Sequence, residues 1–155
     1  HLTFNAGKLP WLGLFSSVLV FTQSILGGLV ASRWAAQQCF GGIALCNVMN
    51  MHIAGVVPPT AAVALLVFSV WRRPALNKHL RLLANSAGLL VLLQIALGIG
   101  TLKLRLQVEP LTVCHQTIGA ALLGCLLSFT VLALRDHRAQ SKPLTHPGLQ
   151  LETSL

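Results

Sequence analysis

The sequence predicts an all-α integral membrane protein in which four transmembrane helices form one bundle. Of its 155 residues, 54% are hydrophobic and 9% are charged, whereas a soluble domain usually carries about a quarter charged residues. Four apolar runs contain no Asp, Glu, Lys or Arg, and each is at least 20 residues long. A helix of that length crosses a hydrocarbon core of about 30 Å. The composition excludes an ordinary soluble enzyme and a disordered chain.

Each apolar run is expected to form one helix: Trp11–Ser32, His52–Trp71, Leu82–Leu102 and Leu111–Leu134. The first run is too long for a signal peptide, and three more spans follow it. Pro58 and Pro59 are expected to kink the second helix after its first turns, because proline interrupts helical hydrogen bonding. Short connections between the runs favour an antiparallel four-helix bundle.

The basic residues predict the orientation of the bundle. Eight lie at one end of the predicted bundle, namely Lys8, Arg72, Arg73, Lys78, Arg81, Arg135, Arg138 and Lys142. Only Arg33, Lys103 and Arg105 lie at the other end. The positive-inside rule therefore predicts a multi-pass protein of a bacterial plasma membrane or its equivalent, with both termini in the cytoplasm. The formal charge of +8 is accounted for by these loops, so the expected partners are membrane lipids and not nucleic acid.

Two similar motifs recur in the same order. Gln23-Ser-Ile-Leu-Gly27 in the first run matches Gln94-Ile-Ala-Leu-Gly98 in the third. The second run opens with His52-Ile-Ala-Gly55, and the fourth contains His115-Gln-Thr-Ile-Gly119. The order predicts a bundle made of two repeated helical hairpins. The two glutamines either hydrogen-bond between helices or touch a ligand, and helix packing is the simpler interpretation.

His52 and His115 are the candidate cofactor ligands. They are the only histidines inside the four runs, and ionisable groups at membrane depth commonly mark functional sites. Both lie toward the outer ends of even-numbered helices, so an antiparallel bundle holds them at similar depth. Two neutral imidazoles on facing helices can bind heme iron from both sides of the porphyrin. Gly55 and Gly119, each one turn away, are predicted to make room for the macrocycle.

Other interpretations of the histidines stay open. A single histidine near a membrane interface is often a polar anchor or a helix-capping residue. Zinc is a weaker alternative, because no carboxylate or third histidine is expected at that depth. The remaining histidines lie at termini or in inner loops and are predicted to be solvated.

Cys39 and Cys46 lie in the first outer loop, separated by a glycine pair. The spacing and an oxidising compartment favour a disulfide. The pair is either redox-active, exchanging with a thiol partner, or a structural link within the loop.

These features together resemble one half of heme A synthase, the family that oxidises the methyl group of heme O to the formyl group of heme A. Members consist of two four-helix halves, each with a histidine pair. The resemblance covers roughly residues 9–138, and Val-Met-Asn-Met-His-Ile-Ala-Gly is similar to the second half of bacterial members. It implies an oxidoreductase with a heme b bound by His52 and His115.

One position departs from the family's catalytic half. In that half a Glu precedes the first histidine by three residues, whereas Met49 stands here. The resemblance therefore implies the C-terminal cofactor half, which carries no catalytic residue and relays electrons. Its expected partner is a preceding catalytic half in a longer protein, as a first residue other than Met suggests, or a second copy of itself. The electron donor is unknown.

The expected domain organisation is a heme-binding transmembrane domain over residues 1–138 and a flexible cytoplasmic tail over 139–155. Two alternative functions remain. One is a stand-alone membrane b-type cytochrome for electron transfer. The other is a heme-free transporter or assembly subunit.

Overall fold

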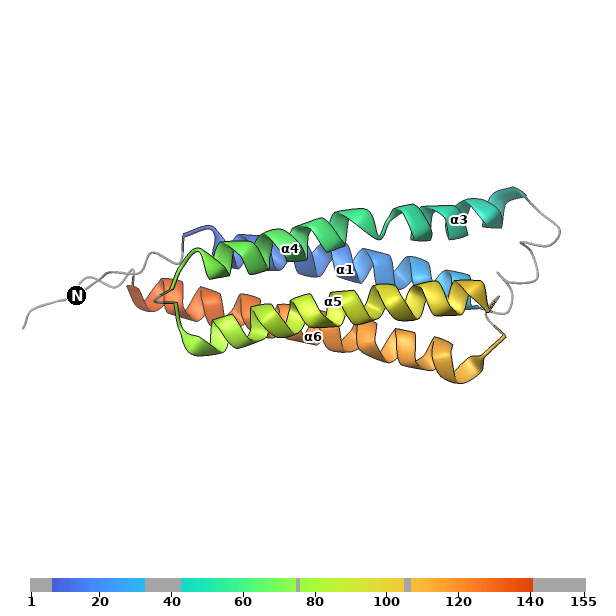
Figure 1. Cartoon of the computed structure of the whole chain (residues 1–155). Coiled ribbons are helices and arrows are strands. Elements are labelled where there is room, and N and C mark those ends of the chain that lie inside the picture. Colours follow the sequence, from blue (N-terminus) through green and yellow to red (C-terminus); the bar gives the residue numbers. More distant parts are fainter. Residues whose placement is uncertain (1–6, 33–42, 75, 105–106, 141–155) are drawn as a thin grey trace, which may run out of the picture.

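A computed structural model describes residues 7–32, 43–74, 76–104 and 107–140, with only the backbone given for residues 43–46 and 140. Every regular element in these ranges is a helix: α1 (Leu9–Ala31), α3 (Ile43–Ala54), α4 (Val57–Trp71), α5 (Lys78–Lys103) and α6 (Glu109–Gln140). Figure 1 shows the helices running side by side along one axis.

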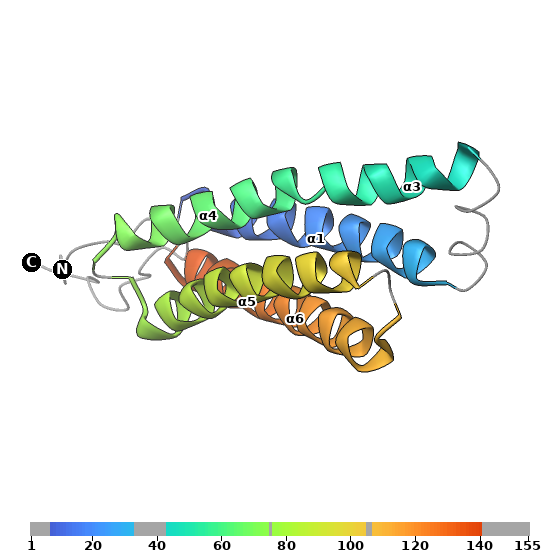
Figure 2. The same cartoon turned by 45° about the vertical axis from the view of Figure 1, so that its right-hand side comes forward.

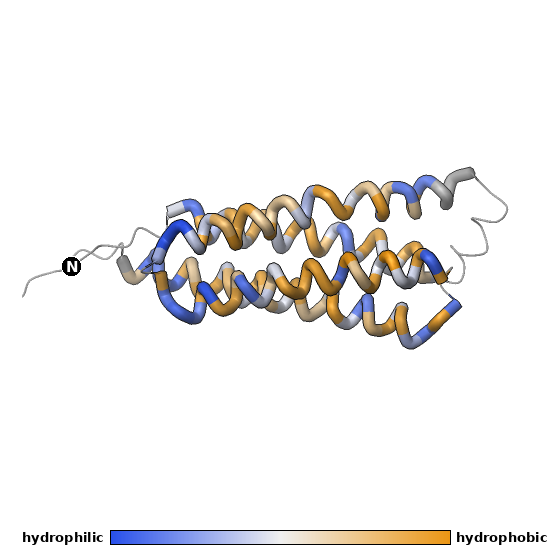
Figure 3. Tube along the Cα trace, viewed as in Figure 1, coloured by the Kyte–Doolittle hydropathy of each residue, from blue (hydrophilic) through white to orange (hydrophobic). Residues whose placement is uncertain are grey.

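The predicted number of membrane-length helices is confirmed. Four helical segments are long and apolar enough to cross a membrane: Leu9–Ala31, Asn47–Trp71, Lys78–Lys103 and Glu109–Ala139. In Figure 3 hydrophobic positions run along the helices, and hydrophilic positions gather at the end near the N-terminus. The predicted boundary at residue 138 lies two residues before the end of α6.

The second span is interrupted, and the break lies directly before the two prolines. α3 ends at Ala54 and α4 begins at Val57. Pro58 and Pro59 occupy the first turn of α4, where backbone N–H groups have no helical partner and proline is well tolerated. The span also begins at Asn47, so the predicted start at His52 was too late. His52 therefore lies within the span and not at its end.

Helix packing places the second and fourth spans across the bundle from each other. α1 packs against α3, α4 and α6, whereas α5 packs against α4 and α6. This arrangement puts α1 and α5 on one diagonal of the bundle, and the α3–α4 span and α6 on the other. The views in Figures 1 and 2 agree with these neighbours.

A glycine allows α1 and α6 to approach closely. A Cβ added at Gly13 would lie 2.7 Å from Oγ1 of Thr130 and 3.0 Å from Cδ1 of Phe129. Small residues allow this kind of helix contact in membranes, where packing and not water exclusion holds helices together. This contact holds α1 and α6 together at the end of the bundle where α1 begins.

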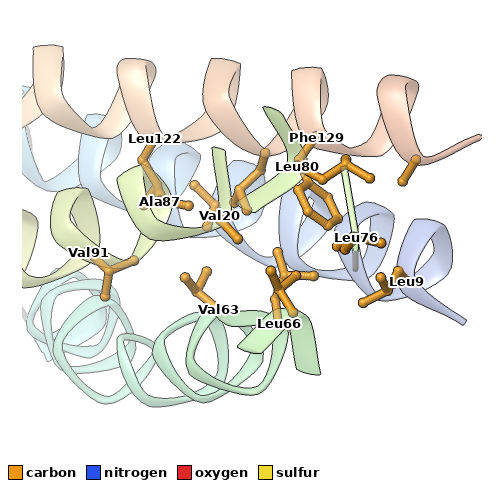
Figure 4. Close-up of a cluster of buried hydrophobic side chains, with 14 residues drawn as sticks. Leu9, Val20, Val63, Leu66, Leu76, Leu80, Ala87, Val91, Leu122 and Phe129 are labelled. Atoms are coloured by element: carbon orange, nitrogen blue, oxygen red, sulfur yellow. The ribbon is translucent and has the colours of Figure 1, made fainter. Parts of the chain in front are cut away.

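The buried apolar core lies in one half of the bundle, and Figure 4 shows its side chains gathered between the helices. We call this part the basic half (residues 9–20, 62–91 and 122–140) and the other part the histidine half (residues 21–31, 43–61, 92–103 and 109–121). The core cluster comprises Leu9, Val20, Val63, Leu66, Val70, Leu76, Leu80, Ala84, Ala87, Val91, Leu122, Leu126, Phe129 and Ala133. All of these lie in the basic half. Among side chains that the structure describes, the histidine half contributes none to the cluster.

The basic half is expected to face the cytoplasm. In a background without native cysteines, His79→Cys should react with a membrane-impermeant thiol reagent only after the membrane is opened. Gln107→Cys, exposed at the opposite end, should react in intact cells. The reason is the excess of Lys and Arg at the basic end. The reverse labelling pattern would show that the orientation is inverted.

Candidate functional site

His52 and His115 are both half-buried and lie in the histidine half of the bundle. His52 belongs to α3 and His115 to α6, so they come from diagonally placed helices. The two candidate ligands are therefore contributed by helices on opposite sides of the bundle.

The imidazole of His52 contacts a glutamine and a glycine of α1. Nε2 of Gln23 lies 3.0 Å from Nδ1 of His52 and also donates to the backbone carbonyl of His52. A Cβ added at Gly27 would lie 2.9 Å from Cε1 of His52. The ring therefore lies directly over Gly27, in space that any side chain would fill. We call Gln23, Gly27, His52 and Gly55 the first cluster.

His115 has the same kinds of neighbours on α5. Nε2 of Gln94 lies 3.4 Å from Nε2 of His115. A Cβ added at Gly98 would lie 3.1 Å from Cε1 of His115. Nδ1 of His115 and Oε1 of Gln94 are buried without a hydrogen-bond partner among the described residues. We call Gln94, Gly98, His115 and Gly119 the second cluster.

The glycines beside the imidazoles differ from the pair singled out in the sequence. A Cβ at Gly55 would lie 2.6 Å from Oε1 of Gln23, and one at Gly119 would lie 3.0 Å from Nε2 of Gln94. Gly55 and Gly119 thus make room for the glutamine side chains, whereas Gly27 and Gly98 make room for the imidazoles. Gly27 and Gly98 each lie four residues after a glutamine, on the same face of its helix. This spacing is the feature of the sequence that could have identified them.

The hydrogen-bonding interpretation of Gln23 and Gln94 is confirmed, since each contacts a histidine on the next span. A polar side chain at membrane depth costs free energy unless it finds such a partner. The two contacts therefore hold the histidines as well as joining neighbouring helices.

His52 and His115 are the candidate ligands that the described residues bring to this site. No group of three or more His, Cys, Asp or Glu side chains that could hold a metal ion occurs among the described residues. Zinc needs three or four protein ligands, but heme iron takes four from the porphyrin and needs only two axial ones. An imidazole nitrogen that is buried and unpartnered, as in His115, is consistent with a ligand role.

Cys39 lies outside the described residues, and only the backbone of Cys46 is described, in α3, so the disulfide stays a prediction. Met49 lies one turn before His52 and is half-buried. His79 is exposed at the basic end, as predicted.

No protein-family model, curated protein or solved structure matches the chain.

Proposed function

We propose that the chain is a membrane heme-binding oxidoreductase domain whose His52 and His115 are axial ligands of a heme b. We further propose that it belongs to an enzyme of heme A biosynthesis, in which this domain relays electrons for oxidation of the heme O methyl group. The observation that carries the proposal is a pair of half-buried imidazoles on diagonal helices, beyond the end of the buried core.

The bundle supplies three conditions for such a site. Each histidine is contacted by a glutamine on a neighbouring helix. The buried cluster stops at Val20, Val63, Val91 and Leu122, so the histidine half is not filled by large buried apolar side chains of the described residues. Heme supplies reversible one-electron chemistry when it is bound, and the apolar helices would limit the access of water to it.

The proposal includes two repeated hairpins. Each cluster contains Gln, Gly, His and Gly in that order along the chain, and corresponding pairs are in contact. A duplicated unit would deliver one equivalent ligand from each hairpin. This accounts for both histidines at once, which a polar anchor or a capping role does not.

A stand-alone b-type cytochrome is the second candidate. The chain has only three acidic residues, and the position three before His52 is Met49. Electron relay requires no proton-transferring carboxylate, so a function in electron transfer alone is compatible with this composition.

Purified protein in detergent is expected to show a strong Soret band and sharp α and β bands on reduction, with a pyridine hemochrome spectrum of heme b. A colourless protein that remains helical after growth with added heme precursor would instead support the transporter or assembly function. Extraction of hemes from a host that makes heme O separates the other two candidates. Heme A should appear only when a catalytic half is supplied together with this chain.

A further inference from the structure

The hairpin formed by α4 and α5 presents an exposed polar surface at the basic end of the bundle. On α4, Phe68, Trp71 and Arg72 are exposed, and their spacing places them on one side of the helix. On α5, Lys78 and Asn85 are exposed two turns apart, so they also share one side. A hydrogen bond of 2.8 Å from Nε1 of Trp71 to Oδ1 of Asn85 joins the two sides. These five side chains therefore belong to one surface, which we call the hairpin face.

The hairpin face lies where the apolar spans meet the charged end of the bundle. The second candidate membrane span ends at Trp71, and on α5 Arg81 is the last charged residue before the apolar stretch. Tryptophan is enriched at this depth in membranes, because its ring is apolar and its N–H is polar. Asn85 accepts the indole N–H through its oxygen, so its amide nitrogen is the donor that the pair can offer to a ligand.

The guanidinium group of Arg72 is held against the apolar part of the same surface. Its Cζ lies 4.9 Å from the centre of the Phe68 ring, which is one turn earlier in α4. Phe68 is more than half exposed and lies inside the candidate span. The positive charge is therefore drawn back toward the apolar band by the ring. A guanidinium that stacks on an aromatic ring can still bind a phosphate through its N–H groups.

The charge of this region is strongly positive. The chain from the start of α4 to the end of α5 contains no Asp or Glu, but four basic residues lie at its basic end, namely Arg72, Arg73, Lys78 and Arg81. Arg81 donates to the backbone carbonyl of Pro74. Asp136 of α6 is the one acidic residue that the structure describes at this end, and it accepts from Asn77. Arg72 and Lys78 are therefore the cations that the hairpin face can direct at an anion.

We infer that the hairpin face binds an anionic phospholipid, whose phosphate is contacted by Arg72, Lys78 and the amide nitrogen of Asn85. Phe68 on α4 and Leu89 on α5, both more than half exposed, supply apolar surface for its acyl chains. The positive-inside rule accounts for the end at which the charges lie. It does not account for the contact of Arg72 with Phe68 or for the pairing of Trp71 with Asn85. The site lies in the basic half, so it does not depend on the proposed heme.

The test is native mass spectrometry of the purified full chain in neutral detergent, titrated with phosphatidylglycerol. The wild-type protein should bind this lipid more tightly than phosphatidylcholine with the same acyl chains. Arg72→Gln and Lys78→Gln should each weaken the binding of phosphatidylglycerol about fivefold, the factor expected for one cation at a membrane surface. Arg138→Gln is the matched control, because Arg138 is exposed at the same end but lies on α6, across the bundle from α4. It should keep the wild-type affinity.

Weakening confined to Arg72→Gln and Lys78→Gln would support the site. Equal weakening in Arg138→Gln would show that only the net charge attracts the lipid, and would overturn it. Equal affinity of the wild-type protein for the two lipids would also overturn it, because the head-group charge would then contribute nothing. Displacement of phosphatidylglycerol by equimolar inorganic phosphate would identify a site for free anions in place of a lipid site.

Discussion

Replacement of His52 or His115 by alanine is expected to abolish the six-coordinate low-spin spectrum of the heme-loaded protein. Each substitution removes one of the two axial nitrogens, and the described site offers no third histidine to replace it. The product should be five-coordinate high-spin iron or protein without heme. Loss of a residue that only supports a ligand already reduces metal affinity by about 10–100-fold, so loss of a ligand should exceed this. Absorption and electron paramagnetic resonance spectra report the change directly.

His79→Ala is the matched control, because His79 is exposed at the basic end of the bundle. Its spectrum should be that of the wild-type protein. Circular dichroism would establish that the four-helix body of each alanine variant remains folded, which is expected because the buried cluster contains neither histidine. If both His52→Ala and His115→Ala retained an unaltered low-spin spectrum, the ligand assignment would be wrong.

Gly27→Val is expected to change the heme spectrum nearly as much as the histidine substitutions do, although Gly27 has no side chain that could bind iron. A Cβ at this position would lie 2.9 Å from Cε1 of His52, so the imidazole must move away from α1. A displaced imidazole can no longer reach iron in the same geometry as the His115 ring. The low-spin spectrum should be converted largely to a high-spin one, measured as the shift of the Soret band.

Gly28→Val provides a neighbouring control on the same helix. A Cβ at Gly28 has no atom within 4 Å, so the substitution meets no neighbour. Both variants make the same change in helix propensity, which isolates the contact with His52. Gly28→Val should keep the wild-type spectrum. Equal spectra for the two variants would show that Gly27 does not support the heme ligand.

The number of helices and the candidate histidines could be predicted from the sequence, because hydrophobic length and polar residues at membrane depth are local signals. The contact between Gly27 and the His52 ring could not be predicted from the sequence. Gly55 is three residues from His52 on the same span, and it was predicted to make room for the macrocycle. The actual neighbour lies on α1, and it depends on how α1 and α3 are rotated about their axes. That rotation is set by contacts such as the hydrogen bond between Gln23 and His52, which join residues far apart in the sequence.

The break in the second span was predicted from Pro58 and Pro59, but its position was not. The prolines sit in the first turn of α4, where their missing N–H groups cost little. The interruption therefore moves to Gly55 and Val56. As a result His52 is carried on a separate short helix, and its placement is set by the packing of α3 against α1.

The confinement of the buried cluster to the basic half has a consequence for biogenesis. The buried apolar contacts between the helices lie away from the two histidines. Under the proposed function, the bundle can assemble before the heme arrives, and the histidine half can receive the heme afterwards. Maturation would then proceed in two separable stages, so a shortage of the prosthetic group would leave intact, empty protein ready for loading, and not misfolded chain for degradation.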